Sequence, residues 1–240
     1  MFHFNNDPKG ATNSLAEINR LAGIRGWAYR NAPDLIVLGR TALKLDADPK
    51  LVLDKLYHPA REHDPNFAGT AQAIGDLALS KSDYELAGRT FQLALKRHPK
   101  NADLHFGAAR AFAPSDGKTM TQHLQATLTA NPNHAGARLL MADRLIDREA
   151  YDEAETQLSK VLAVNPHHPE AWAYRSVIAH LRADTTAESK AREQALAHWK
   201  TNPRVDHLIG KKLSQKYRFS EGSAHQKQAC LLYTSPSPRD

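Results

Sequence analysis

The sequence predicts an all-α protein, built as a solenoid of antiparallel helix pairs, and three observations support this fold class. Small side chains recur at positions 8, 20 and 27 of a 34-residue period, with large apolar side chains at 7 and 24 and proline at 32. No segment alternates apolar and polar residues with the period of two that half-buried strands need. Aromatic residues make up only 7% of the chain, which suits helices that pack closely through small side chains.

The first clear copy of the period spans residues 68–101. Its small residues are Gly75, Ala87 and Ala94, its large ones Ile74 and Phe91, and its proline is Pro99. Small residues let two helix axes approach, and proline ends the second helix because it lacks an N–H and clashes with the preceding turn. One such pair cannot bury its own apolar faces, so neighbouring pairs must stack.

Further copies follow in phase, most closely at 135–168 and more loosely at 102–134, 169–202 and 203–229. The periodicity predicts helix pairs at 68–80 and 84–97, 102–112 and 117–130, 135–147 and 151–164, 169–181 and 185–199, and 203–216 and 220–229. This pattern resembles the tetratricopeptide (TPR) repeat over about two-thirds of the chain. The resemblance implies a right-handed TPR-type superhelical solenoid in which residues 68–229 form five units, the last of them truncated.

The N-terminal part is less regular. We expect residues 1–10 to be disordered and residues 11–67 to form an irregular helical lead-in or degenerate repeats. Asn13 or Ser14 could cap a helix that runs to about Tyr29, followed by a second helix over 35–45. A third helix is expected over 49–57, with Asp48 as its N-cap and proline at its first position.

Residues 230–240 resemble a translated sequencing-library adapter, although an ordinary disordered Pro/Ser-rich terminus is the alternative. Both interpretations place this tail outside the fold. Under the adapter interpretation the protein is a fragment whose last repeat, 203–229, lacks a polar capping helix. Self-association through this uncapped C-terminal end is then expected.

Motifs for catalysis or for binding a cofactor or metal do not occur in the sequence. The thirteen histidines include no pair spaced four apart, and Cys230 is the single cysteine. Glycine-rich phosphate-binding loops and a Gly-x-Ser-x-Gly elbow are also missing. We therefore expect a non-enzymatic chain without a cofactor, and apolar runs such as Leu35–Leu38 are far shorter than a membrane span of about 20 residues. A soluble, cytoplasmic protein is the default expectation, or an exported one if the true N-terminus lies upstream.

Charge is distributed unevenly along the chain, whose formal net charge is +6. Residues 203–229 carry six basic and two acidic side chains, whereas residues 135–168 carry four basic and six acidic ones. A polarised solenoid of this kind could steer an acidic partner to one end. Nucleic acid is not the expected partner, because few aromatic side chains accompany the basic cluster.

The TPR resemblance implies a protein–protein interaction scaffold that holds a peptide or protein in a concave groove lined by the first helices. The implied groove residues are Gln72, Asp76, Phe106, Arg110, Leu139, Asp143, Ile146, Asp147, Val177, His180, Leu208, Lys211 and Gln215. Mixed charge with scattered apolar side chains would suit an extended or helical peptide. The alternative is that these residues form only a solvated concave face.

Residues 202–222 resemble a segment of large bacterial TPR proteins in which a peptidase MA-like (gluzincin) domain follows. This resemblance implies an alternative function, as the non-catalytic arm of a longer metallopeptidase. An RNA-binding helical repeat is the third possibility.

Overall fold

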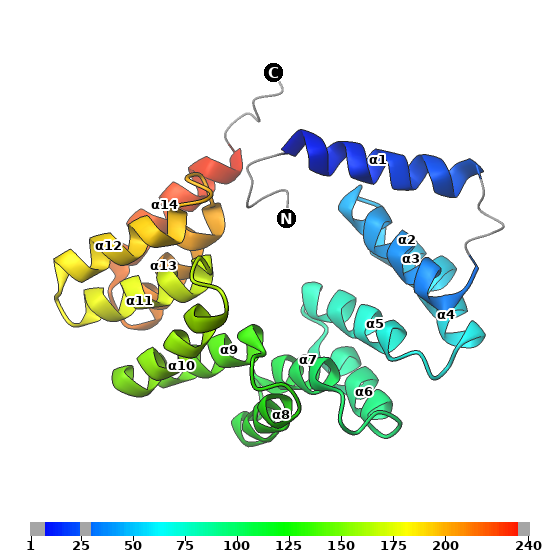
Figure 1. Cartoon of the computed structure of the whole chain (residues 1–240), viewed down its shortest axis with the longest axis horizontal. Coiled ribbons are helices and arrows are strands. Elements are labelled where there is room, and N and C mark those ends of the chain that lie inside the picture. The colour runs from blue at the N-terminus through cyan, green and yellow to red at the C-terminus, as the bar shows by residue number, and fades with distance from the viewer. Residues whose placement is uncertain (1–7, 25–29, 235–240) are drawn as a thin grey trace. The chain divides into compact units, whose positions relative to one another are not determined.

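The computed structural model describes residues 8–24 and 30–234. These residues form helices and no strand, and they divide into two compact units between residues 132 and 133, one from 8 to 132 and one from 133 to 234. The first unit contains α1 (Pro8–Ile24), α2 (Ala32–Lys44), α3 (Pro49–Val52), a π-helical turn (Leu53–Tyr57), α4 (His58–His63), α5 (Ala68–Ser80), α6 (Tyr84–Leu95), α7 (Ala102–Phe112) and α8 (Gly117–Ala130). The second contains α9 (Ala135–Asp147), α10 (Tyr151–Val164), α11 (Pro169–Leu181), α12 (Thr185–Leu196), α13 (Pro203–Gln215) and α14 (Phe219–Thr234) (Figure 1).

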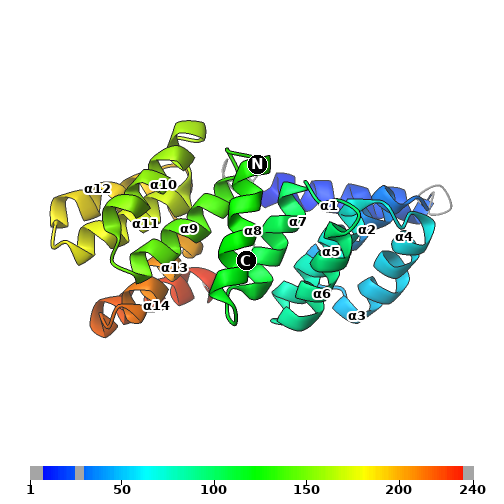
Figure 2. The same ribbon diagram turned by 90° about the horizontal axis from the view of Figure 1, so that it is seen from below.

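Consecutive helices pair as the 34-residue period predicts. Helix α5 packs on α6, α7 on α8, α9 on α10, α11 on α12 and α13 on α14, and the partners lie side by side in both views (Figures 1 and 2). Within each unit, first helices also pack on the next first helix, as α5 does on α7 and α11 on α13. Stacking of this kind covers the apolar faces that a single pair would leave exposed.

The small residues of the period permit the close approach that the sequence predicts. A Cβ atom on Gly75 of α5 would lie 2.3 Å from the ring of Phe91, and one on Gly107 of α7 would also lie 2.3 Å from that ring. Phe91 itself has no exposed surface. Its ring is therefore clamped between two glycines, one from each neighbouring first helix.

The turns inside four of the pairs share one geometry that the sequence did not reveal. Position 15 of each copy is a non-glycine residue in the left-handed region: Ser82 (φ 60°), Glu149 (φ 61°), Ala183 (φ 58°) and Tyr217 (φ 63°). The following N–H donates to the carbonyl five residues earlier at 2.9 Å in each, as Asp184 does to Ala179. This is the Schellman C-cap, which usually carries glycine, so a search for glycine at these turns misses it.

The lead-in differs from the expectation at its first helix. Helix α1 begins at Pro8, inside the segment expected to be disordered, and ends at Ile24. Proline suits the first turn of a helix because its φ is already helical, so Asn13 and Ser14 lie within the helix and do not cap it. The predicted N-cap Asp48 is confirmed, since its carboxylate accepts the N–H of Lys50 at 2.8 Å. Residues 1–7 and the expected end of this helix near Tyr29 lie outside the described residues.

The C-terminal helix is also longer than expected. Helix α14 continues through Cys230 to Thr234, five residues beyond the helix end expected at residue 229. Residues 229–234 contain no helix breaker, and the next proline is Pro236, which explains the continuation. Ala229 is buried in this helix whereas Leu231 is exposed. Residues 235–240 lie outside the described part of the chain.

Candidate functional site

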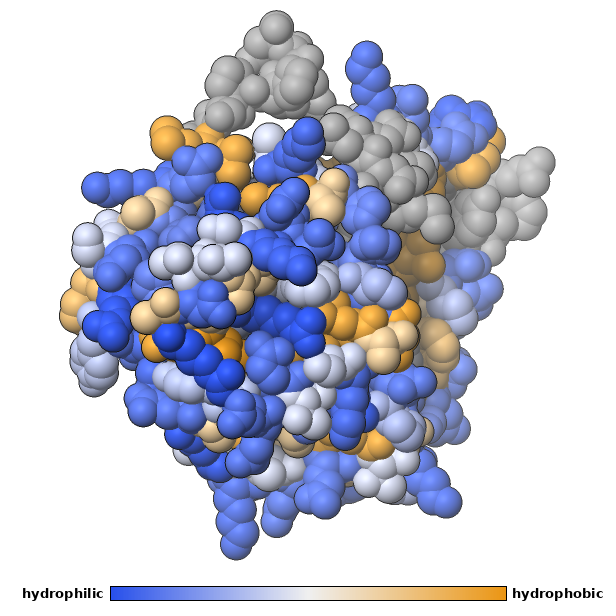
Figure 3. All heavy atoms as spheres, turned by 60° about the vertical axis from the view of Figure 1, so that its left-hand side comes forward, coloured by the Kyte–Doolittle hydropathy of each residue, from blue (hydrophilic) through white to orange (hydrophobic). Residues whose placement is uncertain are grey.

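The first helices of the pairs in the unit 133–234 surround a concave pocket of about 490 Å³. Helix α11 packs against α9 on one side and against α13 on the other. The pocket is lined by Leu140 and Asp143 of α9, Glu170 and Tyr174 of α11, and Arg204, His207, Leu208, Lys211 and Lys212 of α13. By contrast, the face on the side of α10 and α12 is mostly hydrophilic, with apolar side chains in small scattered patches (Figure 3).

A buried ammonium group forms the base of this pocket. Lys212 Nζ lies 2.6 Å from Asp143 Oδ1 and 2.8 Å from Asp147 Oδ1, and its side chain is only 4% exposed. Tyr174 donates its hydroxyl to Asp143 Oδ1 at 3.0 Å. Because the buried charge is paired with two carboxylates, its desolvation is compensated. The contacts join α13 to α9 across α11.

The protonation of Tyr174 supports this arrangement. Burial raises the pKa of Tyr174 well above its usual value, and the nearby Asp143 carboxylate raises it further. The phenol therefore stays neutral at physiological pH and can donate to Asp143. Lys216 extends the ionic contacts at the end of α13, where its Nζ lies 2.8 Å from Glu149 Oε1.

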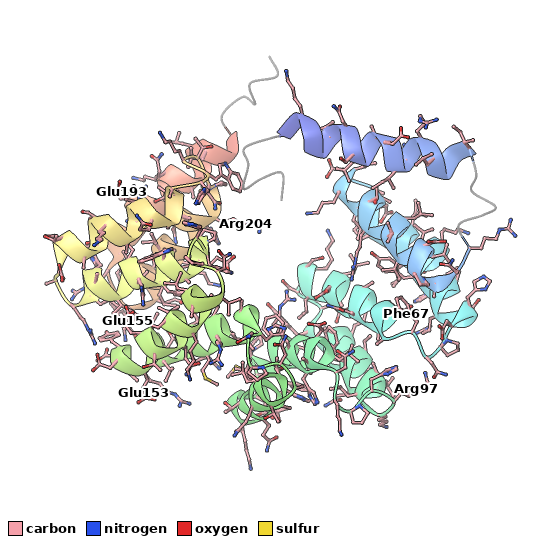
Figure 4. The ribbon with its side chains drawn as sticks, in the orientation of Figure 1. Phe67, Arg97, Glu153, Glu155, Glu193 and Arg204 are labelled. Carbon is pink, nitrogen blue, oxygen red and sulfur yellow. The ribbon has the colours of Figure 1, made fainter. Side chains whose placement is uncertain are left out.

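Three basic side chains on α13 face the solvent above this base. Arg204, His207 and Lys211 are exposed, and their spacing of three and four places them on one helix face. Within residues 133–234 as described, their side chains form no hydrogen bond or ion pair. We call these three residues the cation stripe, after the two full charges of Arg204 and Lys211. Figure 4 shows Arg204 at the start of α13, on the opposite side of this unit from Glu153 of α10.

Three of the predicted groove residues, Asp143, Leu208 and Lys211, meet at this pocket. Asp147 is linked to it through Lys212, and Gln215 is exposed at the end of the same helix. His180 is engaged elsewhere, because its Nδ1 lies 3.0 Å from Glu188 Oε1 on α12.

Three other groove residues are not available to a partner. Leu139, Ile146 and Val177 belong to the hydrophobic core of their unit, with exposed fractions of 6%, 0% and 0%. The expectation that they line an open groove is wrong, because the first helices pack closely enough to cover these positions. Aliphatic side chains at such positions indicate core packing between first helices.

The remaining predicted residues lie in the unit 8–132. Arg110 of α7 donates to Asp76 Oδ1 of α5 at 2.9 Å, which joins equivalent positions of adjacent repeats. The guanidinium of Arg110 also lies 5.8 Å from the centre of the Phe106 ring. Gln72 is half-buried on the same helix as Asp76. The two charged groove residues predicted in this unit, Asp76 and Arg110, are therefore paired with each other.

A larger pocket of about 870 Å³ also lies in the unit 8–132, and its lining includes Val37, Arg40, Tyr57 and Asp76. Asp76 is the only groove residue predicted from the sequence that contributes to it. The side chain of Tyr57 is buried there, and this burial raises the pKa of its hydroxyl group.

Five residues at this pocket were not among the predicted groove residues, although two of them belong to the basic cluster of residues 203–229: Arg204, His207, Lys212, Glu170 and Tyr174. The stripe on α13 could have been found from the three- and four-residue spacing of its basic side chains. The partners of Lys212 could not, since Asp147 lies 65 residues away in sequence. Among the described residues, no group of three or more His, Cys, Asp or Glu side chains is placed to hold a metal ion, and no helix is long and apolar enough to cross a membrane.

Comparison with known proteins identifies the repeats. Residues 73–118 and 121–181 each match a family model described as tetratricopeptide repeat. A search of curated proteins finds no match. The matches lend no support to the peptidase MA-like resemblance of residues 202–222.

Several solved structures share the fold. A thermophilic TPR protein of Thermus thermophilus, TTC0263, is 18% identical over 71% of this chain and 93% of its own, with a TM-score of 0.57. A TPR protein of Parabacteroides merdae is 15% identical over 86% of this chain and 80% of its own, with a TM-score of 0.58. MamA (41-end) of Desulfovibrio magneticus is 17% identical over 71% and 97%, with a TM-score of 0.50. These likenesses confirm the predicted all-α TPR solenoid.

Proposed function

We propose that this chain of tetratricopeptide repeats is a binding scaffold that holds a protein or peptide partner on the first-helix face of residues 133–234. The observation that carries the proposal is the cation stripe, Arg204, His207 and Lys211, which lies unpaired above the pocket between α9, α11 and α13. Nothing in this proposal requires a catalytic step. The chemistry is that of recognition.

The charges around the pocket favour a partner with acidic side chains. Asp143 is committed to Lys212 and Tyr174 at its base, which leaves Glu170 as the one uncommitted acidic residue of the pocket lining. Arg204 and Lys211 therefore give the rim a positive charge. Complementary charge of this kind speeds association and selects the partner.

Apolar contacts are available beside the charges. Leu140 and Leu208 line the pocket and are half-buried, so each keeps surface that a partner side chain could cover. An extended or helical segment in which acidic residues flank a leucine would satisfy both features. The proposal thus names the chemistry of the partner: an acidic peptide with an apolar anchor.

The proposal is tested by fluorescence anisotropy of the intact chain with a labelled peptide, Gly-Asp-Leu-Glu-Asp-Leu-Glu-Gly. We expect the double variant Arg204→Gln/Lys211→Gln to weaken binding by roughly tenfold or more, since each lost charge contact contributes about 1 kcal/mol. The matched control is Lys190→Gln/Lys200→Gln, which removes two exposed charges on and after α12. Equal loss in both variants, or no binding of the peptide, would contradict the proposal.

The same assay separates a peptide scaffold from an RNA-binding repeat. A single-stranded RNA that binds more tightly than the peptide, with affinity that falls steeply with salt, would favour the RNA-binding alternative. For the peptide we expect a shallow salt dependence, because only two full charges contact it.

A further inference from the structure

A second pocket, of about 360 Å³, lies in the unit 8–132 on α4, α5 and α6 and the loops beside them. Its position differs from that of the first-helix pocket described above, and none of the predicted groove residues lines it. The apolar part of its wall includes Phe67, Ile74 and Leu93. Leu93 is 62% exposed although it is a large apolar side chain on a packed helix. Leu93 and the half-buried Phe67 therefore offer apolar surface that no part of this unit covers, whereas Ile74 is buried.

A hydroxyl group without a partner lies in the same wall. Thr70 is 2% exposed, and its Oγ1 has no hydrogen-bond partner. Buried polar groups in proteins are almost always hydrogen-bonded, and each exception requires a reason. Because Thr70 lines the pocket, an acceptor atom of a bound molecule can supply the missing bond.

The helix that carries Thr70 also begins without a side-chain cap. Phe67 occupies the N-cap position of α5, and its side chain has no oxygen to accept a backbone N–H, although its carbonyl accepts the N–H of Thr70 at 3.1 Å. The N–H groups at Ala68 and Gly69 have no hydrogen-bond partner within the described residues of this unit. The first turn of a 13-residue helix therefore presents free donors and a partial positive charge. Ala68 is itself part of the pocket wall.

Two arginines add full charges at this pocket. Arg97 follows α6 and donates one N–H to the carbonyl of Pro65 at 2.8 Å, which holds it beside the loop that carries Phe67. Figure 4 shows Arg97 and Phe67 on the same side of this unit. Arg61 of α4 lines the pocket and forms no ion pair or hydrogen bond in the part of the chain that the structure describes. The lining also holds one acidic residue, Asp64, which accepts the N–H of Asn66 at 2.9 Å, but the basic residues Arg61, Lys96 and Arg97 outnumber it.

We propose that this pocket binds a small carboxylate that has an apolar body. The carboxylate accepts from the Thr70 hydroxyl and the first turn of α5 and is neutralised by Arg61 and Arg97, while the apolar body lies against Phe67, Ile74 and Leu93. A neutral molecule would leave the two arginines unused, and a purely polar anion would leave the apolar wall wet. The volume lies at the lower end of the range for small-molecule pockets, roughly 300–1,000 Å³.

The test is isothermal titration of the intact chain with 4-phenylbutyrate, compared with 4-phenylbutyramide, which has the same apolar body and no charge. We expect the acid to bind at least tenfold more tightly than the amide. Arg97→Gln should weaken binding of the acid by roughly fivefold to tenfold, because a charged hydrogen-bond donor is lost. Lys118→Gln, which removes an exposed charge on α8 outside the pocket, should leave the affinity unchanged.

Thr70→Val separates a ligand-binding role from a structural one. Valine has nearly the shape of threonine, and the hydroxyl makes no bond in the protein, so we expect the unfolding midpoint to stay the same or rise. We expect the affinity for 4-phenylbutyrate to fall at least threefold in this variant. Unchanged affinity in Thr70→Val, equal binding of acid and amide, or no heat from either compound would overturn the proposal. Because the cation stripe lies in the other unit, Arg204→Gln/Lys211→Gln should not alter this titration.

Discussion

Replacing Gly75 by alanine tests the packing that makes these helices a stack. In an ordinary helix this change stabilises, by about 0.5–1 kcal/mol, because glycine loses more backbone entropy on folding. Here the new Cβ would lie 2.3 Å from Phe91 Cζ. The ring has no exposed surface and cannot retreat toward α7, where Gly107 approaches it equally closely.

The magnitude follows from these two opposing effects. Overpacking a filled core costs typically about 1–3 kcal/mol, which exceeds the helix-propensity gain. We therefore expect Gly75→Ala to lower the free energy of unfolding by about 1–2 kcal/mol. When Gly75→Ala is made in a chain that already carries Phe91→Leu, we expect it to lower the free energy of unfolding much less, because the shorter side chain leaves room for the new methyl group.

Urea unfolding followed by circular dichroism at 222 nm measures the effect. Gly88→Ala on α6 is the matched control, since its Cβ would lie 3.5 Å from the nearest atom, at ordinary contact distance. That variant should be stabilised by roughly 0.5–1 kcal/mol. If Gly75→Ala is stabilised as much as Gly88→Ala, the reasoning about close helix approach through glycine is refuted.

Three further changes test other parts of the structure. Ala183→Gly should raise the free energy of unfolding by about 0.5–1 kcal/mol in urea, because glycine adopts the left-handed C-cap without strain; a loss of stability would contradict the assigned turn. Asp206→Asn should lower the free energy of unfolding by about 1–3 kcal/mol, because the buried carboxylate accepts hydrogen bonds from Arg192 at 2.9 Å and His225 at 2.7 Å. An unchanged urea midpoint would show that these bonds do not hold α12 and α14 to α13. Burial, reinforced by the neighbouring His105, lowers the pKa of His123. On acidification below about pH 6.5 the unfolded chain therefore binds this proton before the folded chain does, and the free energy of unfolding falls. Thermal melts from pH 7.5 to 5 should show a smaller decline in midpoint for His123→Gln than for the unaltered chain, and identical declines would contradict the assignment.

Local sequence signals predicted most of the helices because the physical cause of each lies within a few residues. Asp48 caps its own helix, and Pro99 and Pro166 each follow the end of a second helix. The contact between Gly75 and Phe91 was predictable because a helix pair places its small and large residues at fixed positions of the period. The start of α1 was misplaced although Pro8 is itself a local signal for the first turn of a helix.

The candidate site was predicted only in part, because it depends on contacts between repeats. Lys212 and Asp147 are separated by 65 residues, and no local pattern shows that they form an ion pair. Leu139 and Val177 were placed in the groove although neighbouring first helices cover them, since the period alone does not give the spacing between repeats. The orphan hydroxyl of Thr70 likewise becomes visible only when three helices are brought together.

The measurement that tests the central claim most directly is methyl NMR of the intact chain, titrated with the acidic peptide. We predict chemical-shift changes at Leu140 and Leu208, which line the first-helix pocket, with little change at Leu158 in the core and none at the exposed Leu231 of α14. The changes should disappear in Arg204→Gln/Lys211→Gln. Shifts confined to α12 or α14, with Leu140 and Leu208 unaffected, would contradict a partner site on the first helices.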